Sequence, residues 1–274
     1  MMLREATKLE GYALHARDGV IGNVKDFYFD DQHWHIRYLV VWTGSWLKGR
    51  NVLISPEVVR APDNDQKTFP VDLTMDQVRN SPGIETDLPF SRQYEAELRR
   101  HYGWPPYWAV GFPEGGVAPP VPGPVAPPAR ERERTDGDRP LDLRGDPHLR
   151  SVNDTKGFDI EALDGAIGHV EDFLIDGKIW RIWYLVIDTR NWWPGKKVIV
   201  PPAWIRSMSW DKSEVVVDLA RDAIKASPEY GPGAPWDSGY ARRLHEHYRR
   251  PPYPDWDSSA PAGIVKEEDN RNRP

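Results

Sequence analysis

The sequence contains no cysteine among its 274 residues. This absence excludes disulfide bonds, thiolate metal sites and a cysteine nucleophile, and it is compatible with a reducing compartment. Long apolar runs are also lacking, because the longest are 38–42 and 182–187, whereas a membrane-spanning helix needs roughly 20 apolar residues. Residues 1–5 become charged too early for a secretory signal. We therefore expect a cytoplasmic protein.

The sequence also has no excess of positively charged residues. The formal net charge is −6 and the isoelectric point about 5.8, so the surface as a whole repels phosphate backbones and we do not expect nucleic acid as a partner. The sequence has no glycine-rich phosphate loop opening a helix and no nucleophile elbow. We therefore expect a protein that is not an enzyme and that carries no cofactor.

What the chain does contain is a copy of itself, displaced by 146 residues without a gap. Gly11 recurs as Gly157, Trp34 as Trp180, and the Pro-Pro-Tyr of 105–107 as 251–253. A match of this length indicates a duplication. It predicts two units, 1–107 and 149–257, joined by a linker over 108–148 and followed by a disordered tail over 258–274. The linker is proline-rich and then charged, so we expect extended chain, with a docking segment for a proline-reading partner as the alternative.

The front half of each copy predicts strands. Residues 33–41 and 179–187 alternate with a period of two, and Asp30-Asp31 supplies the turn of a hairpin that precedes the first of them. Trp34 and Trp180 are predicted to begin these strands as core residues. Gly22 and Gly168 interrupt an earlier strand and predict a bulge or a barrel corner.

The back half of each copy predicts two helices. Asp72 and Asp218 are expected to cap the first helix, and Ser81-Pro82 and Ser227-Pro228 to end it. The second helix is predicted to start at Ser91 in one copy and at Asp237 in the other. It carries an apolar stripe at positions i, i+4 and i+8 in both copies: Tyr94, Leu98 and Tyr102, matched by Tyr240, Leu244 and Tyr248.

Two segments of each front half resemble the PRC-barrel domain, the module of the photosynthetic reaction centre H subunit and of a ribosome-maturation factor. The first is Asp-Gly-x-Ile-Gly-x-Val-x-Asp-Phe at 18–27 and 164–173, and the second is Trp-x-Ile-x-Tyr-Leu-Val-Val/Ile at 34–41 and 180–187. The resemblance covers about 11–75 and 157–220. It implies a mainly β fold with helical extensions: two tandem small antiparallel β-barrels, each followed by two short helices.

The strongest candidates for an interface are aromatic. A loop after each alternating strand keeps a tryptophan in both copies, and loop tryptophans are frequent at protein interfaces. The alternative is that these rings fold back over their own barrel. The interface candidates are the loop residues and the helical stripes: Trp42, Trp46, Trp192, Trp193, Tyr94, Leu98, Tyr102, Tyr240, Leu244 and Tyr248.

Polar candidates are better explained by structural roles. Six acids are matched between the copies: Asp18, Asp26, Asp30, Asp164, Asp172 and Asp176. Carboxylates of this kind can shuttle protons or bind a cation, but most stand where turns need aspartate. His33 and His35 would point the same way on a strand, yet the second copy has Ile179 and Arg181 there and no third ligand is evident. We expect no metal site.

The leading functional hypothesis is a non-enzymatic adaptor whose two barrels present an aromatic surface to a protein partner or to each other. By analogy with the H subunit, the first alternative is an accessory factor of a membrane electron-transport or photosynthetic complex, with peripheral rather than spanning membrane association. The second alternative is an RNA-processing or ribosome-associated factor. The family also contains many stand-alone bacterial proteins of unknown role, and the chain is most similar to those.

Overall fold

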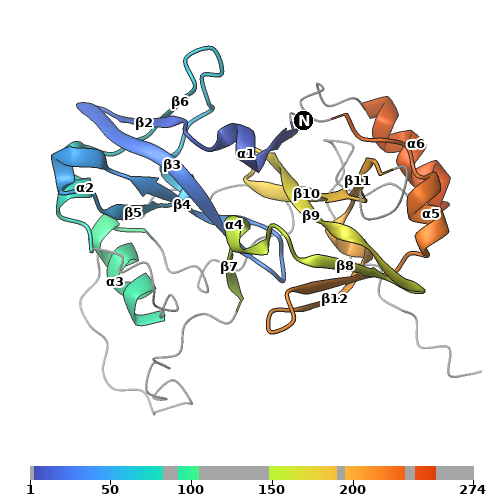
Figure 1. Cartoon of the computed structure of the whole chain (residues 1–274). Coiled ribbons are helices and arrows are strands. Elements are labelled where there is room, and N and C mark those ends of the chain that lie inside the picture. Colours follow the sequence, from blue (N-terminus) through green and yellow to red (C-terminus); the bar gives the residue numbers. More distant parts are fainter. Residues whose placement is uncertain (1–2, 83–91, 105–147, 190–194, 232–237, 251–274) are drawn as a thin grey trace, which may run out of the picture.

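A computed structural model describes residues 3–82, 92–104, 148–189, 195–231 and 238–250. In this part of the chain the fold is mostly β with some helices (Figure 1). None of the helices in the described ranges is both long and apolar enough to cross a membrane. The elements of the first half are β1 (Leu3–Glu5), α1 (Ala6–Leu9), β2 (Ala13–Ala16), β3 (Gly19–Asp30), β4 (Ile36–Trp42), η1 (Gly44–Leu47), β5 (Asn51–Ile54), η2 (Pro56–Val58), β6 (Thr68–Pro70), α2 (Met75–Arg79) and α3 (Arg92–Tyr102).

The second half repeats most of these elements at the spacing that the sequence predicts. Its elements are β7 (Leu149–Ser151), α4 (Val152–Thr155), β8 (Asp159–Ala162), β9 (Gly165–Asp176), β10 (Arg181–Asp188), β11 (Lys197–Val200), η3 (Pro202–Trp204), β12 (Ile205–Ser209), β13 (Glu214–Val217), α5 (Arg221–Ala226) and α6 (Ser238–Tyr248). Strand β12 has no counterpart among the described strands of the first half. The strand order β5-β4-β3-β2-β6 of the first sheet is matched by β11-β10-β9-β8-β13 in the second. The duplication therefore extends from the sequence to the topology.

The N-terminal segment of each half lies on the other half. We call residues 3–9 (β1 and α1) the first arm and residues 149–155 (β7 and α4) the second arm. Strand β1 pairs antiparallel with β9, with Leu3 opposite Asp176, and β7 pairs with β3, with Leu149 opposite Asp30. These two registers are equivalent under the repeat. In Figure 1 the helices α1 and α4 accordingly lie in the middle, between the two sheets.

A pseudo-twofold axis passes between His35 and Arg181, which are equivalent residues and form an isolated β-bridge. On either side of this bridge the Ile36 N–H donates to the Trp180 carbonyl (2.7 Å) and the Ile182 N–H donates to the Trp34 carbonyl (2.8 Å). Both tryptophans have positive φ, 61° for Trp34 and 54° for Trp180. They lie in the turns before the strands, which begin at Ile36 and Arg181, so the prediction that they begin the strands is wrong. The left-handed backbone conformation of Trp34 and Trp180 directs the carbonyl of each residue toward the opposite half.

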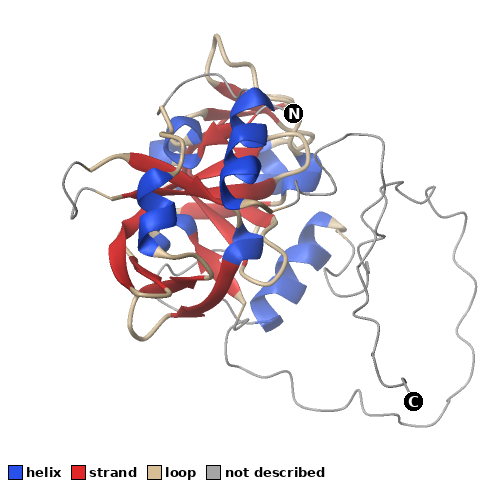
Figure 2. Cartoon of the chain, turned by 90° about the vertical axis from the view of Figure 1, so that its right-hand side faces the viewer, coloured by secondary structure: helices blue, strands red, loops and turns tan. Residues whose placement is uncertain are grey.

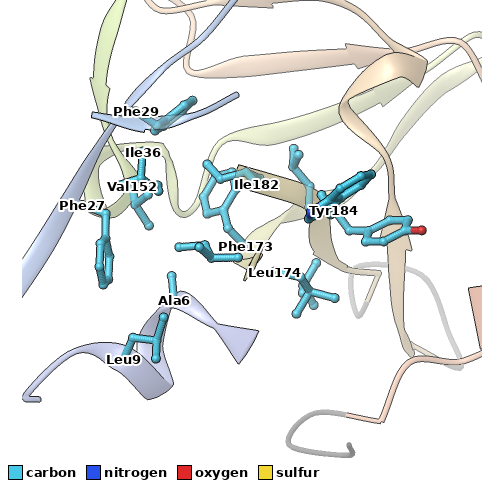
Figure 3. Packing of buried hydrophobic residues seen from close by; sticks show 14 of the residues in the cluster. Ala6, Leu9, Phe27, Phe29, Ile36, Val152, Phe173, Leu174, Ile182 and Tyr184 are labelled. Carbon is cyan, nitrogen blue, oxygen red and sulfur yellow. The ribbon is translucent and has the colours of Figure 1, made fainter. Parts of the chain in front are cut away.

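Most of the buried apolar side chains of the two halves form one continuous core across this axis. Trp180 is 6% exposed and packs against two rings of the first half, with centroids 5.5 Å from Phe69 and 6.3 Å from Phe27. Phe29 meets Phe173 at 5.8 Å. Figure 3 shows Phe27, Phe29 and Phe173 in this core, together with Ala6 and Leu9 of α1 and Val152 of α4. Trp34 is only partly buried, so the two equivalent tryptophans are not equally deep.

The longer helices cover the outer faces of the sheets (Figure 2). Leu98 of α3 packs on Tyr38, Val40 and Leu53, which is the face of β4 and β5 turned away from the main core. Both faces of the central strand are therefore buried.

The helix ends differ from the prediction at one point. The short helices begin at Met75 and Arg221, after Thr74 and Ala220. Thr74 is the side chain that caps α2, whereas Asp72 pairs with Arg60 at 2.6 Å and Asp218 with Arg250 at 2.9 Å. The predicted caps at Asp72 and Asp218 are therefore two residues too early.

The strand pairings among the described residues form two open sheets rather than closed barrels. Gly22 and Gly168 lie beside register shifts, as predicted. A Cβ at either position would stand 2.0 Å from a backbone carbonyl, that of Trp42 or of Asp188. Glycine is therefore required where β3 crosses the end of β4, and β9 the end of β10.

Candidate functional site

The aromatic loop of the first half follows the central strand β4. Trp42 ends this strand and is 40% exposed. Trp46 lies in η1, where its indole Nε1–H donates to the Ile21 carbonyl at 2.6 Å and its ring packs partly against the core. The loop therefore holds one tryptophan against its own half and leaves the other facing solvent.

Several contacts fix the shape of this loop. The N–H and hydroxyl of Thr43 both donate to the Arg50 carbonyl, at 3.1 and 2.8 Å, and the Gly49 N–H donates to the Gly44 carbonyl at 2.7 Å. Gly49 lies under the Trp42 indole, since a Cβ there would come within 2.9 Å of the ring. The Arg50 guanidinium also donates to carbonyls at the C-terminal end of α2. The exposed ring thus stands on a loop tied to the scaffold at both ends.

The second half differs at the equivalent position. Asp188 replaces Trp42 and is fully buried. The predicted candidates Trp192 and Trp193 lie outside the described residues. Among the residues that the structure describes, the exposed large apolar side chains are Val20, Trp42, Leu163 and Ile179, so Trp42 is the one aromatic ring in this set.

The helical stripes face their own sheets. Leu98 and Leu244 are fully buried. The flanking tyrosines are partly buried and are bound within their own half: the hydroxyls of Tyr94 and Tyr240 donate to the carbonyls of Pro82 and Pro228, Tyr102 stacks on Trp104, and Tyr248 meets Trp204 edge-on. Burial raises the pKa of these four hydroxyls. The six residues pack each helix on its sheet instead of forming a free surface.

Four of the six matched acids have local roles. Asp18 and Asp164 accept the first backbone N–H of α2 and α5, from Met75 at 2.8 Å and Arg221 at 2.7 Å. Asp30 and Asp176 accept backbone N–H groups within the turns that follow β3 and β9. These contacts are the turn and capping roles expected from the sequence.

The other two acids bind the exchanged arms. Asp172 accepts the backbone N–H of Thr7 at 3.4 Å and also the Thr7 hydroxyl. Asp26 accepts the Ser151 hydroxyl at 2.5 Å and the Asn153 N–H at 3.1 Å. Burial raises the pKa of Asp26 to about 6 and also raises that of Asp172. Each carboxyl therefore caps the helix of the opposite half at an electrostatic cost.

The paired histidines do not form a common site. The His33 ring lies 3.2 Å from Asp30, whereas His35 lies at the pseudo-twofold axis, where burial and then the charge of Arg181 lower its pKa to about 4. Within the described ranges one other group, His169, Glu171 and Asp188, has ligand atoms within 4.8 Å of one another. The Lys197 ammonium lies 2.5 Å from Glu171, so this cluster already holds a cation of its own.

A buried ionic cluster lies under α3. Glu95 is paired with Arg37, accepts from Tyr38 at 2.8 Å and lies 3.3 Å from the Nε of Arg99. All four residues are almost completely buried. The second half carries Trp183, Tyr184, Ala241 and His245 at these positions. The first copy thus joins helix and sheet by charge at positions where the second copy carries aromatic side chains, an alanine and a histidine.

The exchanged arms are not among the elements predicted from the sequence. The repeat is readable there, since Leu3-Arg4 recurs as Leu149-Arg150, but these segments precede the stretch that carries the family pattern. An unbroken comparison of the two copies back to Leu3 would have marked both arms as elements shared by the two halves. It would not have told which sheet each arm joins.

Residues 3–78 match the family model of the PRC-barrel domain, and no curated protein matches the chain. The match begins at the first residue of the first arm and ends in α2. It includes the glycine at which β3 crosses the end of β4, the aromatic loop and the turn at the pseudo-twofold axis. Residues 3–78 are therefore a PRC-barrel domain.

Proposed function

We propose that this chain is a non-enzymatic, protein-binding adaptor that docks a protein partner on the Trp42 loop. The observation that carries this proposal is an exposed tryptophan on an ordered loop. A tryptophan supplies a large apolar area with one polar N–H, and such rings are the residues on which binding free energy concentrates in protein interfaces. A loop already fixed in shape loses little conformational entropy on binding.

The neighbourhood of Trp42 supports this role. Trp46 and Leu47 lie partly buried on the same loop, and the Arg79 guanidinium stands 5.8 Å from the Trp46 ring centroid. An apolar centre with an arginine beside it matches the usual make-up of an interface core and its rim. The equivalent part of the second half has a buried carboxylate in place of Trp42, so we assign docking to the first half.

The proposal is tested by quantitative affinity capture with the full chain and two variants. Trp42→Ala should reduce recovery of the specific partner at least about tenfold, because truncating a central interface tryptophan usually costs about 2 kcal/mol or more. Leu163→Ala is the matched control, since Leu163 is 53% exposed and lies in the second half. Equal recovery of every captured protein by both variants would contradict docking on this loop.

We also infer that each sheet forms the wall of a small barrel whose seam is spanned by a short 3-10 turn. In the second half the two edge strands are β11 and β12, and only Pro201 and η3 separate them along the chain. In the first half, bridges from Val59 to Val71 and from Asp63 to Thr68 place the segment after η2 beside β6. Nuclear Overhauser contacts between side chains of β11 and β12 would support closure, and their absence would leave two open sheets.

A further inference from the structure

The two arms are received by equivalent sites on opposite halves. Each site is a strand edge, on β9 or β3, followed by a carboxyl that accepts hydrogen bonds from the first turn of the incoming helix. The carboxyl is that of Asp172, which is buried, or that of Asp26, which is partly buried. Leu3, Ala6 and Leu9 of the first arm are buried when it is bound. Strand addition with an apolar anchor and a polar cap is a recognised mode of peptide binding.

The turns at the pseudo-twofold axis add a second set of contacts between the halves. The carbonyls of the two left-handed tryptophans accept N–H groups from the opposite half. A bulky residue at positive φ is rare and persists only where surrounding contacts compensate for it. Here both such residues make hydrogen bonds across the axis, and Trp180 fills space between Phe27 and Phe69.

The charged contacts across the axis join unlike residues at equivalent positions. Glu10 and Lys156 are equivalent under the repeat, and the Lys156 Nζ lies 2.7 Å from the Glu10 carboxylate. Two first halves would bring glutamate to glutamate at this point, and two second halves would bring lysine to lysine. Arg181 would likewise meet a second arginine on the axis. Like charges placed together at an interface select strongly against the wrong pair.

A further ion pair depends on a residue that differs between the two copies. Asp31 of the first half lies 3.1 Å from Arg150 and 2.9 Å from His148 of the second. The residue equivalent to Asp31 is Gly177, so a second half offers its own arm no carboxylate there. The second arm therefore fits the first half better than it would fit a copy of its own half.

We propose that the two halves are specific binding partners that form a heterotypic pseudo-dimer, hold together without the connecting chain, and reject pairing with their own kind. The exchanged arms and the axis turns bind the halves together, and the Glu10–Lys156 and Asp31–Arg150 contacts select the unlike pair. This pairing does not involve the Trp42 loop, so the pairing of the halves and the docking of a partner are tested separately.

The test uses the full chain with a protease recognition site placed within 113–128, cut after purification. Native mass spectrometry and size-exclusion chromatography should then show one complex that contains both fragments, with a mass near the 31.5 kDa of the chain. Two separate fragments, or homodimers of either one, would overturn the proposal.

Charge selection is tested on the same cut protein. Glu10→Lys should raise the dissociation constant of the fragment pair at least about tenfold, and adding Lys156→Glu should restore most of the affinity. Asp76→Lys is the matched control, because Asp76 forms an ion pair with Arg79 at 2.9 Å within the first half. If Glu10→Lys and Asp76→Lys change the dissociation constant equally, or the double variant fails to recover, charge selection at the axis is wrong.

Discussion

Truncation of Trp180 to alanine removes a buried side chain of the second half that packs against two rings of the first half. The ring is 6% exposed and contacts Phe69 and Phe27 of the first half. A buried indole removes about 200 Å² from water, which at about 25 cal/mol per Å² corresponds to about 5 kcal/mol. Measured tryptophan truncations in cores cost about 3–5 kcal/mol. We therefore expect the free energy of unfolding to fall by about 3–5 kcal/mol.

The assay is urea unfolding followed by far-ultraviolet circular dichroism, which does not depend on the tryptophan removed. Trp34→Ala is the matched control, because Trp34 occupies the equivalent turn but is only partly buried and stacks on Phe29 at 5.4 Å. Its loss should be smaller, about 1–3 kcal/mol. A loss below about 1 kcal/mol for Trp180→Ala, or equal losses for the two variants, would refute the placement of Trp180 in a shared core.

Three further predictions concern single positions. Because the pKa of Asp26 is raised to about 6, the folded state holds a proton that the unfolded chain releases, and the free energy of unfolding should fall by up to about 3 kcal/mol as the pH rises from 4 to 6. Asp26→Asn should flatten this part of the plot of unfolding free energy against pH, and an unchanged slope would contradict the raised pKa. Glu95→Gln leaves Arg37 buried without its carboxylate and should cost about 3–5 kcal/mol in urea unfolding, against less than 1 if the cluster is hydrated. Gly22→Ala should clearly lower the midpoint of thermal unfolding, because a Cβ there would clash with the Trp42 carbonyl. Gly177→Ala is the control and should not lower the midpoint, because a Cβ at Gly177 meets open space. Equal shifts in the two variants would contradict the close approach of the Trp42 carbonyl to Gly22.

The sequence predicted the local structure well where local chemistry decides it. The alternating strands, the aspartate turns after β3 and β9 and the glycines beside the bulges are all present. The long helices are described from Arg92 and Ser238 onward, and the predicted starts at Ser91 and Asp237 lie outside the described residues. Turn closure, period-two burial and close backbone contact each depend on a few neighbouring residues, and a single sequence carries that information.

What the sequence did not predict depends on the other half of the chain. A three-residue strand and a single helical turn have no periodicity to read, and their burial exists only on the opposite sheet. The left-handed conformation of Trp34 and Trp180 could not be predicted either, because the alternation of apolar and polar residues suggests that each strand already includes its tryptophan. Asp26 and Asp172 could be read as turn residues or proton carriers, but not as caps of helices more than 120 residues away along the chain.

The most direct measurement of whether the two halves form one cooperative unit is hydrogen exchange in the full-length Ile224→Ala variant. Ile224 is fully buried in α5, at the end of the molecule furthest from the first sheet (Figure 1), and its truncation should cost at least about 2 kcal/mol. If the halves unfold together, the slowest amides of β3 and β4 should exchange about 30-fold faster, as should those of β9 and β10. Faster exchange confined to the second half, with β3 and β4 unchanged, would contradict a shared folding unit.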